Sequence, residues 1–497
     1  MTVRDELPEA VAAAFPFVPA DLTIAHMAST YLPADVHCRF RRMLGHRAEL
    51  ISGIDVHSVQ ASLDGQTRAG MDDRVAHYEG VYRRQMRALN IELDVFERTD
   101  HPAHVHTAAA ALSSLRKAGL VREGRRDVWC CLGCGAYPPV RMTLGAAHPG
   151  APKAPGEQHP GRCPFCHGEH FERRSKSHLF LDLESHRARL KALNRCMNPP
   201  AAQAWVAQVL AHPLPDWNFT RDNRVGIPID DRPEQSLYLW FESLLGYASM
   251  SRLAHRGRQS TLQFHGKNII WHHSVLWPIL LEQGLGGDAS LTRNSIRGFL
   301  DVSHSDPQLL DIDSAVERYP VDYLRFYLVQ SVPLGLSDFR VSRQELKQVC
   351  NAQLCRVLGN LVRRATVILG SRPEESRRIR PDAPLARHFC AQVVPAIERA
   401  TEYGDVRAAT RVAVEYGRML GRMVQQERLY ERSATEVAPR LAFGIASLLT
   451  ILAPIMPELA RSSSPFLGWV PATIFDIPSA LDRPLNDHVP FWAPVAI

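Results

Sequence analysis

Lysine is scarce in this sequence. Only six of the 58 basic residues are lysine, at positions 117, 153, 176, 191, 267 and 347, and none lies between 268 and 346. We attribute the overall scarcity to composition bias, because the remaining basic residues are arginine. The net charge of +6 is mild for 497 residues, so it permits a polyanionic partner without requiring one.

The sequence also lacks long apolar runs. Its first nine residues carry acids and no apolar core, so no secretory signal is visible. No run approaches the roughly 20 apolar residues that span a membrane. These absences argue against a membrane protein and predict a cytoplasmic location. With no export signal, the ten cysteines fit metal binding better than disulfides.

The hydrophobic pattern indicates an α/β protein with a helical end. A helical period runs from about residue 24 to 44, and a short apolar run follows at 50–55. A turn, a helix and then a strand are typical of a doubly wound domain. The apolar runs at 237–241 and 269–273 are expected to add strands to the parallel sheet. After residue 345 the pattern is helical almost to the end.

Four cysteines predict a metal site. They form two Cys-x-x-Cys pairs, Cys131 with Cys134 and Cys163 with Cys166, separated by 28 residues. Two turns that each present two thiolates satisfy the tetrahedral geometry of a structural Zn²⁺ and leave no open position for catalysis. Free or redox-active thiols are the alternative. Cys130 is adjacent and competes for assignment as a ligand.

Several segments, in order from residue 15 to about 460, resemble the methionyl-tRNA synthetases. They include Ser52-Gly-Ile-Asp55-Val-His57, Leu237-Tyr-Leu-Trp240-Phe-Glu242-Ser-Leu-Leu-Gly-Tyr247 and Phe264-His-Gly266-Lys267-Asn268-Ile-Ile-Trp-His-His273. The resemblance implies a class I synthetase with a Rossmann-type catalytic domain and a zinc-binding insertion, followed by an α-helical anticodon-binding-like bundle. The expected domains are residues 1–116 and 236–345 for the two catalytic halves, 117–235 for the insertion and 346–497 for the bundle.

The resemblance also implies an amino-acid pocket. Asp55 stands where the family contacts the α-ammonium of the substrate, and Trp240, Tyr247 and His273 stand where it encloses the methionine side chain. Aromatic walls suit a thioether through contact area and sulfur–π attraction. The remaining pocket positions are Phe15 and Phe17, which replace an aliphatic residue and a tyrosine of the family.

The segments that correspond to the family's ATP-binding motifs match the family less well than the amino-acid pocket does. The family turn His-x-Gly-His is written here Thr23-Ile24-Ala25-His26, and Asn268 replaces an aspartate after Gly266 and Lys267. We expect His26 and Lys267 to be catalytic. The family loop Lys-Met-Ser-Lys-Ser has no counterpart, since the interval 303–313 carries three aspartates and no lysine. Because such lysines stabilise the charge that develops on pyrophosphate, ATP activation is expected to be impaired.

Three residues of the C-terminal part match positions of the family that contact tRNA: Asn360, Arg364 and Tyr430. Tyr430 falls near the position of a family tryptophan that stacks on an anticodon base, and a tyrosine can still stack. The sequence therefore keeps tRNA as a partner with weakened contacts.

The retained pocket and the altered nucleotide half together predict a repurposed enzyme. It would bind methionine or a related amino acid and serve amino-acid condensation in specialised metabolism, with a second amine substrate or a partner enzyme such as a cupin. Two alternatives stay open. One is a non-catalytic pseudo-synthetase that senses an amino acid, and the other is a divergent methionine–tRNA ligase.

Overall fold

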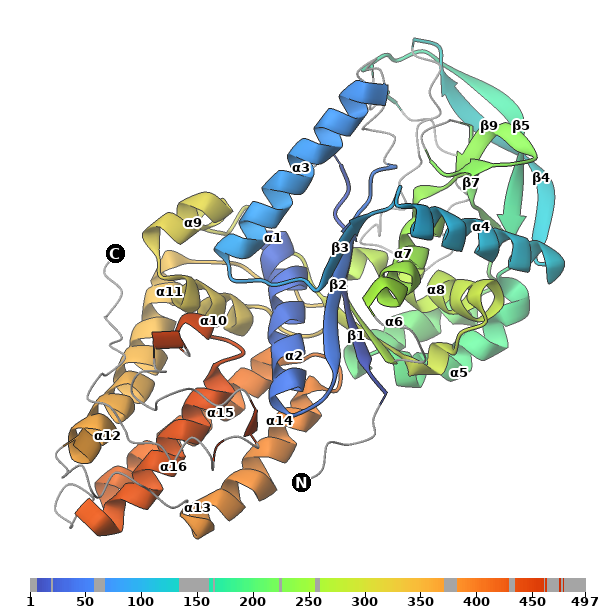
Figure 1. Ribbon diagram of the computed structural model, residues 1–497. Coiled ribbons are helices and arrows are strands. Elements are labelled where there is room, and N and C mark those ends of the chain that lie inside the picture. The colour runs from blue at the N-terminus through green and yellow to red at the C-terminus, as the bar shows by residue number, and fades with distance from the viewer. Residues whose placement is uncertain are drawn as a thin grey trace.

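A parallel five-stranded sheet lies at the centre of the computed structural model (Figure 1). The structure describes residues 7–18, 21–57, 68–133, 161–163, 166–222, 226–254, 260–370, 382–428, 434–459, 461–462, 473–474 and 477. The sheet has the order β11-β10-β1-β2-β3. Its strands are β1 (Glu9–Ala13), β2 (Ala48–Ile54), β3 (Val95–Arg98), β10 (Ser260–Gly266) and β11 (Thr292–Arg297).

The strand order reverses its direction of winding between β1 and β10. The chain passes from β1 to β2 and β3 on one side of the sheet, and later returns to β10 and β11 on the other side. In open α/β sheets, ligands bind beyond the carboxyl ends of the strands where the direction of winding reverses. The residues that directly follow β1, β2 and β10 therefore lie together at the edge of the sheet where a ligand is expected to bind.

Helices cover both faces of the sheet, as alternation of side chains along a strand requires. Val11 and Leu50 belong to one apolar core, and Ala12 and Ile51 to the other. The first face is covered by α1 (Ile24–His26), η1 (Met27–Tyr31), α2 (Leu32–Met43) and α3 (Arg68–Ala88). The second face is covered by α4 (Pro102–Lys117) and α7 (Leu239–Ala254). Both halves of the sequence thus build one doubly wound domain, which confirms the predicted fold class.

Two expected strands are wrong. Residues 237–241 comprise the end of β9 (Arg232–Leu237) and the start of α7. Residues 269–273 open the crossover from β10 to β11, which comprises η4 (Lys267–Ile269), η5 (His272–Leu276), α8 (Trp277–Ile279), η6 (Leu280–Gly284) and η7 (Ala289–Leu291). A short apolar run fits a buried helix and a buried strand equally well, and the period alone does not separate them.

An insertion between β3 and β10 forms two small antiparallel sheets. One contains β4 (Val121–Cys131), β5 (Phe171–Leu181) and β6 (Trp217–Asn218), and the other contains β7 (Thr220–Arg221), β8 (Pro228–Ile229) and β9. The helical elements are η3 (Glu184–His186), α5 (Arg187–Met197) and α6 (Pro200–Ala211). Figure 1 shows the β4–β5 hairpin projecting from the sheet domain beside α4.

The C-terminal part is helical, as predicted. A stem of η8 (Pro307–Leu309), α9 (Ile312–Arg318) and α10 (Val321–Ser331) leads into it. The bundle comprises α11 (Arg343–Val349), η9 (Cys350–Gly359), α12 (Asn360–Gly370), α13 (Ala383–His388), η11 (Phe389–Val393), α14 (Val394–Thr401), α15 (Val406–Gln426) and α16 (Ala434–Leu452). Within the described ranges, no helix is long and apolar enough to cross a bilayer.

A buried ion pair joins the sheet domain to the helical part. The Arg325 side chain on α10 is fully buried, and it donates to Oδ2 of Asp35 on α2 at 2.7 Å. Its Nε donates to the carbonyl oxygen of Ile455 at 2.9 Å, just beyond α16. Because a buried arginine is costly unless its hydrogen-bonding groups are paired, these contacts fix three segments against one another.

Candidate amino-acid pocket and metal centre

Asp55 lies at the carboxyl end of β2 and is 3% exposed. Its backbone holds the segment after β1, because its N–H donates to the Pro16 carbonyl oxygen at 2.8 Å. Its carboxylate accepts hydrogen bonds from Oγ of Ser243 and, at 3.3 Å, from the backbone N–H of His57. Burial, and secondly the Glu242 carboxylate, raise the pKa of Asp55 to about 7. The group is therefore a buried carboxyl poised to ionise near neutral pH.

Helix α7 presents three side chains on one of its faces. Trp240, Ser243 and Tyr247 are spaced at i, i+3 and i+7, so they share a face. The Tyr247 hydroxyl lies 2.9 Å from Nε2 of His273, whose Nδ1 lies 2.9 Å from the Ile269 carbonyl oxygen. A carbonyl only accepts, so Nδ1 carries the hydrogen and Nε2 accepts from the tyrosine. Burial holds the pKa of His273 well below its usual value, which keeps the ring neutral.

Phe15 completes the wall between β2 and α7. Its ring meets that of Tyr247 edge-on, with centroids 5.4 Å apart. A Cβ added to Gly53 would come within 2.8 Å of the Phe15 ring, and one added to Gly246 within 2.4 Å. Both glycines are therefore required for this ring to fit. The sequence patterns did not reveal this role, because the two glycines lie far apart in the chain.

The structure brings together four of the six predicted pocket side chains through direct contacts or a shared helix face: Phe15, Trp240, Tyr247 and His273. Asp55 joins them through Ser243 on the same face of α7. Phe17 differs, since its backbone pairs with Asp55 but its side chain is 44% exposed. Of the two phenylalanines after β1, Phe15 therefore packs against another predicted pocket residue, whereas the Phe17 side chain is exposed to solvent.

A second buried network lies beside Asp55. The Glu242 side chain is fully buried, and its carboxylate lies 2.7 Å from Nδ1 of His57 and 3.7 Å from Nε2 of His104. Nδ1 of His104 lies 2.9 Å from Oγ of Ser249. Burial lowers the pKa of His57, but the neighbouring carboxylates, first of all that of Glu242, together raise it above its usual value. His104 was missed at the sequence level, because nothing in its own segment marks the contact.

The Thr23–His26 turn opens α1. Nδ1 of His26 accepts from the backbone N–H of Thr23 at 3.1 Å, so in the neutral ring Nε2 carries the hydrogen. Thr23 and His26 are exposed and Ala25 is partly exposed. The N–H of Ile24 donates to the Leu310 carbonyl oxygen at 3.3 Å, which connects the turn to the 303–313 segment.

Lys267 follows β10 and is engaged within the protein. Its Nζ lies 2.8 Å from Oδ1 of Asp338 and 3.3 Å from the Leu336 carbonyl oxygen. Asn268 is exposed next to it, and a Cβ on Gly266 would come within 2.7 Å of the Asn268 Oδ1. Two of the three N–H groups of the Lys267 ammonium are thus engaged, which leaves one for a phosphate oxygen.

The aspartates of the 303–313 segment have structural partners. The Asp306 carboxylate pairs with Nε of Arg343. Asp311 caps α9 by accepting from the Ser314 N–H at 2.8 Å. The Asp313 carboxylate lies 3.5 Å from the guanidinium of Arg84. These carboxylates therefore order the segment, and their repulsion of a triphosphate is weaker than the sequence alone suggests.

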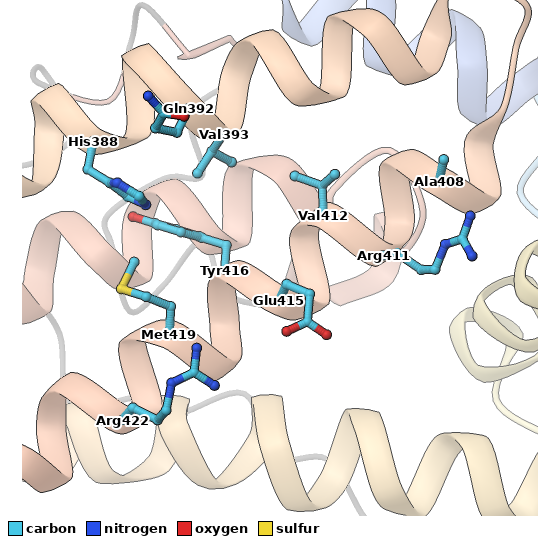
Figure 2. A pocket seen from close by; sticks show the side chains of 10 residues that line it. All are labelled: His388, Gln392, Val393, Ala408, Arg411, Val412, Glu415, Tyr416, Met419 and Arg422. Atoms are coloured by element: carbon cyan, nitrogen blue, oxygen red, sulfur yellow. The ribbon is translucent and has the colours of Figure 1, made fainter.

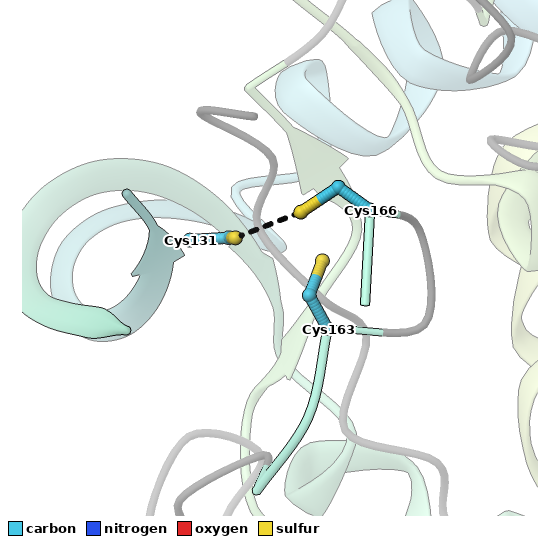
Figure 3. A group of neighbouring side chains, drawn as sticks. All are labelled: Cys131, Cys163 and Cys166. Carbon is cyan, nitrogen blue, oxygen red and sulfur yellow. Dashed lines mark hydrogen bonds between the residues drawn. The ribbon is translucent and has the colours of Figure 1, made fainter. Parts of the chain in front are cut away.

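Three of the four predicted zinc ligands come together (Figure 3). The sulfur atoms of Cys131, Cys163 and Cys166 all lie within 4.8 Å of one another, and those of Cys131 and Cys166 are 3.5 Å apart. Tetrahedral thiolates at a Zn–S distance of about 2.3 Å lie roughly 3.8 Å apart. The donor set therefore fits a structural zinc ion. Cys134, the fourth predicted ligand, lies outside the described residues.

Replacing Cys163 with serine is expected to remove about one equivalent of zinc, because a buried thiolate ligand of the group is lost. Metal analysis of the purified variant measures this directly. Cys390→Ser is the matched control, since Cys390 is an exposed cysteine far from the cluster in sequence and should leave the zinc content unchanged. Equal zinc in both variants would contradict the assignment.

The predicted tRNA-contacting residues Asn360 and Arg364 border a groove of about 270 Å³ between η9, α12 and α15. Its lining includes four arginines and no acid: Arg356, Arg364, Arg418 and Arg422. Tyr430 lies outside the described residues. On the other side of α15 is a cavity of about 510 Å³ (Figure 2), which Arg422 also lines. Neither hollow includes Asp55 or another residue of the predicted amino-acid pocket.

Comparison with known proteins identifies the family. The model of the family described as tRNA synthetases class I (M) matches residues 9–366. The methionine–tRNA ligase of Methanococcus maripaludis strain C7 is 27% identical over 392 residues, covering 72% of this chain and 58% of that protein. The chain thus matches less than two thirds of that relative's length. The corresponding ligase of Thermoplasma acidophilum is 30% identical and covers 71% of each chain.

The three-dimensional fold agrees. A crystal structure of Mycobacterium tuberculosis methionyl-tRNA synthetase bound by methionyl-adenylate aligns with a TM-score of 0.75 at 20% identity, covering 98% of this chain and 99% of that one. At that identity the likeness concerns the fold alone. Since the family model spans well over half of the sequence, the chain belongs to the class I tRNA synthetases of the methionyl type.

Proposed function

We propose that this chain binds methionine, or an amino acid of the same size, and acts as a ligase of its family. One observation carries the proposal. At the carboxyl edge of the sheet, the buried Asp55 carboxylate is linked through Ser243 to the face of α7 that presents Trp240 and Tyr247. A carboxylate pairs with an α-ammonium, and the aromatic side chains of this face together with His273 would pack against an apolar side chain such as that of methionine.

Methionine–tRNA ligation is the reaction that the comparisons favour. Relatives that match more than two thirds of the chain are named methionine–tRNA ligases. The arginine-lined groove beside Asn360 supports a polyanionic partner, since guanidinium groups bind phosphates. ATP would then be the co-substrate, with His26 and Lys267 as its candidate catalytic contacts.

Condensation of an amino acid outside translation is the second candidate. It is favoured by Thr23 and Ala25 in the first motif and by the absence of lysine from 268 to 346. A second amine substrate or a partner enzyme such as a cupin would take the bound amino acid onward, and the relatives' names lend this no support. A pseudo-synthetase that only senses an amino acid shares the same pocket and differs in lacking turnover.

Methionine-dependent ATP–pyrophosphate exchange tests which of these candidate functions the protein has. We expect exchange at least about a hundredfold slower than in a family member with both motifs intact, because losing one preorganised donor to a developing oxyanion costs roughly 10²–10³ in rate. The paired variant Thr23→His with Ala25→Gly rebuilds the first motif and is expected to raise the exchange rate. Calorimetric binding of methionine should change little in that variant, since Asp55 and α7 are untouched.

The outcomes separate the candidates. Exchange followed by charging of methionine tRNA supports the ligase. Methionine binding with exchange but no charging supports condensation, and binding without any exchange supports sensing. Fast exchange by the unaltered protein would contradict the prediction that its ATP activation is impaired. Failure of every amino acid to bind would overturn the proposed pocket.

A further inference from the structure

His272 stands directly beside the proposed pocket. Its ring stacks on that of Trp240, with centroids 4.3 Å apart and an interplanar angle of 28°. The next residue, His273, bonds to Tyr247 two turns further along the same face of α7. Two consecutive imidazoles therefore line the side of α7 that carries the pocket residues.

The two histidines differ in whether their ring nitrogens have hydrogen-bond partners. His273 uses both, one toward Tyr247 and one toward the Ile269 carbonyl oxygen. His272 is only 9% exposed, and its Nδ1 is buried without a hydrogen-bond partner among the described residues. Burial, and secondly the neighbouring His265, lower its pKa to about 3, so the ring is neutral. A buried polar atom left unpaired costs roughly 1–3 kcal/mol and needs an explanation.

Neighbouring side chains do not supply the missing bond. Oγ of Ser274 donates to Asn198 at 2.9 Å, and Nδ2 of Asn294 donates to the same Asn198 oxygen at 2.9 Å. A metal ion does not explain the nitrogen either, because the one candidate metal cluster within the described part of the chain is the cysteine group. A polar group of a ligand bound beside Trp240 would satisfy this nitrogen.

We infer that the pocket takes an amino acid of methionine's size whose side chain carries a hydrogen-bonding group, and that Nδ1 of His272 selects it. This inference rests on the proposed amino-acid pocket. A thioether is only a weak acceptor and has no hydrogen to donate. A sulfoxide oxygen accepts, and a carboxamide both accepts and donates, so either can complete the bonding of a neutral imidazole.

Calorimetric titration with L-methionine, L-methionine sulfoxide and L-glutamine tests the inference. We expect the unaltered protein to bind both polar amino acids at least as tightly as methionine. His272→Phe keeps a planar ring against Trp240 and removes the nitrogens, so it should weaken both polar amino acids about tenfold relative to methionine. His106→Phe, an exposed histidine on α4, is the matched control and should leave all three affinities unchanged.

The results distinguish the inferred role of His272 from the proposed amino-acid pocket on which it rests. A clear preference of the unaltered protein for methionine would overturn the inference, whether or not the variant folds. So would an unchanged ranking in a folded His272→Phe variant, and in both cases methionine binding would leave the pocket standing. If none of the amino acids binds, the pocket itself is wrong and the role of His272 falls with it.

Discussion

Replacing Asp55 with asparagine is expected to weaken amino-acid binding by about a hundredfold or more. Removing one partner of a buried, hydrogen-bonded charge pair costs roughly 2–5 kcal/mol, and each 1.4 kcal/mol is a factor of ten in Kd. Asparagine keeps the shape of Asp55 and can still accept from Ser243, so the change isolates the charge. Isothermal titration of the amino acid bound most tightly by the unaltered protein measures the effect.

The pH dependence of binding supplies an independent readout. Because the pKa of Asp55 is raised to about 7, mainly by burial, its carboxyl is mostly protonated at pH 6 and mostly ionised at pH 8. Only the ionised form attracts an ammonium, so affinity should rise about tenfold between these values. In Asp55→Asn this dependence should be absent.

Asp231→Asn is the matched control, since Asp231 pairs with Arg116 at the surface of the insertion. It should bind the amino acid as the unaltered protein does and keep the same pH profile. Near-normal binding by a folded Asp55→Asn variant would show that the α-ammonium is held elsewhere and would remove the central support of the proposed function.

The sequence predicts the frame of the fold well. The helical period from residue 24 and the apolar run at 50–55 become α1, α2 and β2. The prediction fails where a short apolar run carries no period of its own, as at 237–241 and 269–273, where the residues continue into helices. There the distinction depends on what the segment packs against, which tertiary structure alone decides.

The site is predicted in its residue types but not in its contacts. The family resemblance names Asp55, Tyr247 and His273, yet no local pattern pairs Lys267 with Asp338. These partners lie 71 positions apart and meet because the chain returns to the end of β11, where Leu334 bridges to Arg297 and Phe339 to Leu300. A catalytic lysine inferred from a motif is thus found in an internal ion pair, which sequence reasoning has no means to anticipate.

Replacing Arg325 with methionine is expected to destabilise the protein by roughly 3–5 kcal/mol, because it breaks a fully buried ion pair and the hydrogen bonds around it. A guanidinium has five N–H groups, and all five of Arg325 are used. They reach the Asp35 carboxylate and the carbonyl oxygens of Leu89, Asn90, Pro454 and Ile455. Methionine fills much of the volume but removes these five hydrogen bonds, and Asp35 keeps Arg39 and the Glu92 N–H as donors.

Arg39→Met is the matched control, because Arg39 pairs with the same Asp35 but remains 21% exposed. Water can replace much of its role, so a loss of about 1–2 kcal/mol is expected. Urea unfolding followed by tryptophan fluorescence compares the variants. Equal losses in the two single variants would show that Arg325 is not the group that holds α2, α10 and the segment after α16 together.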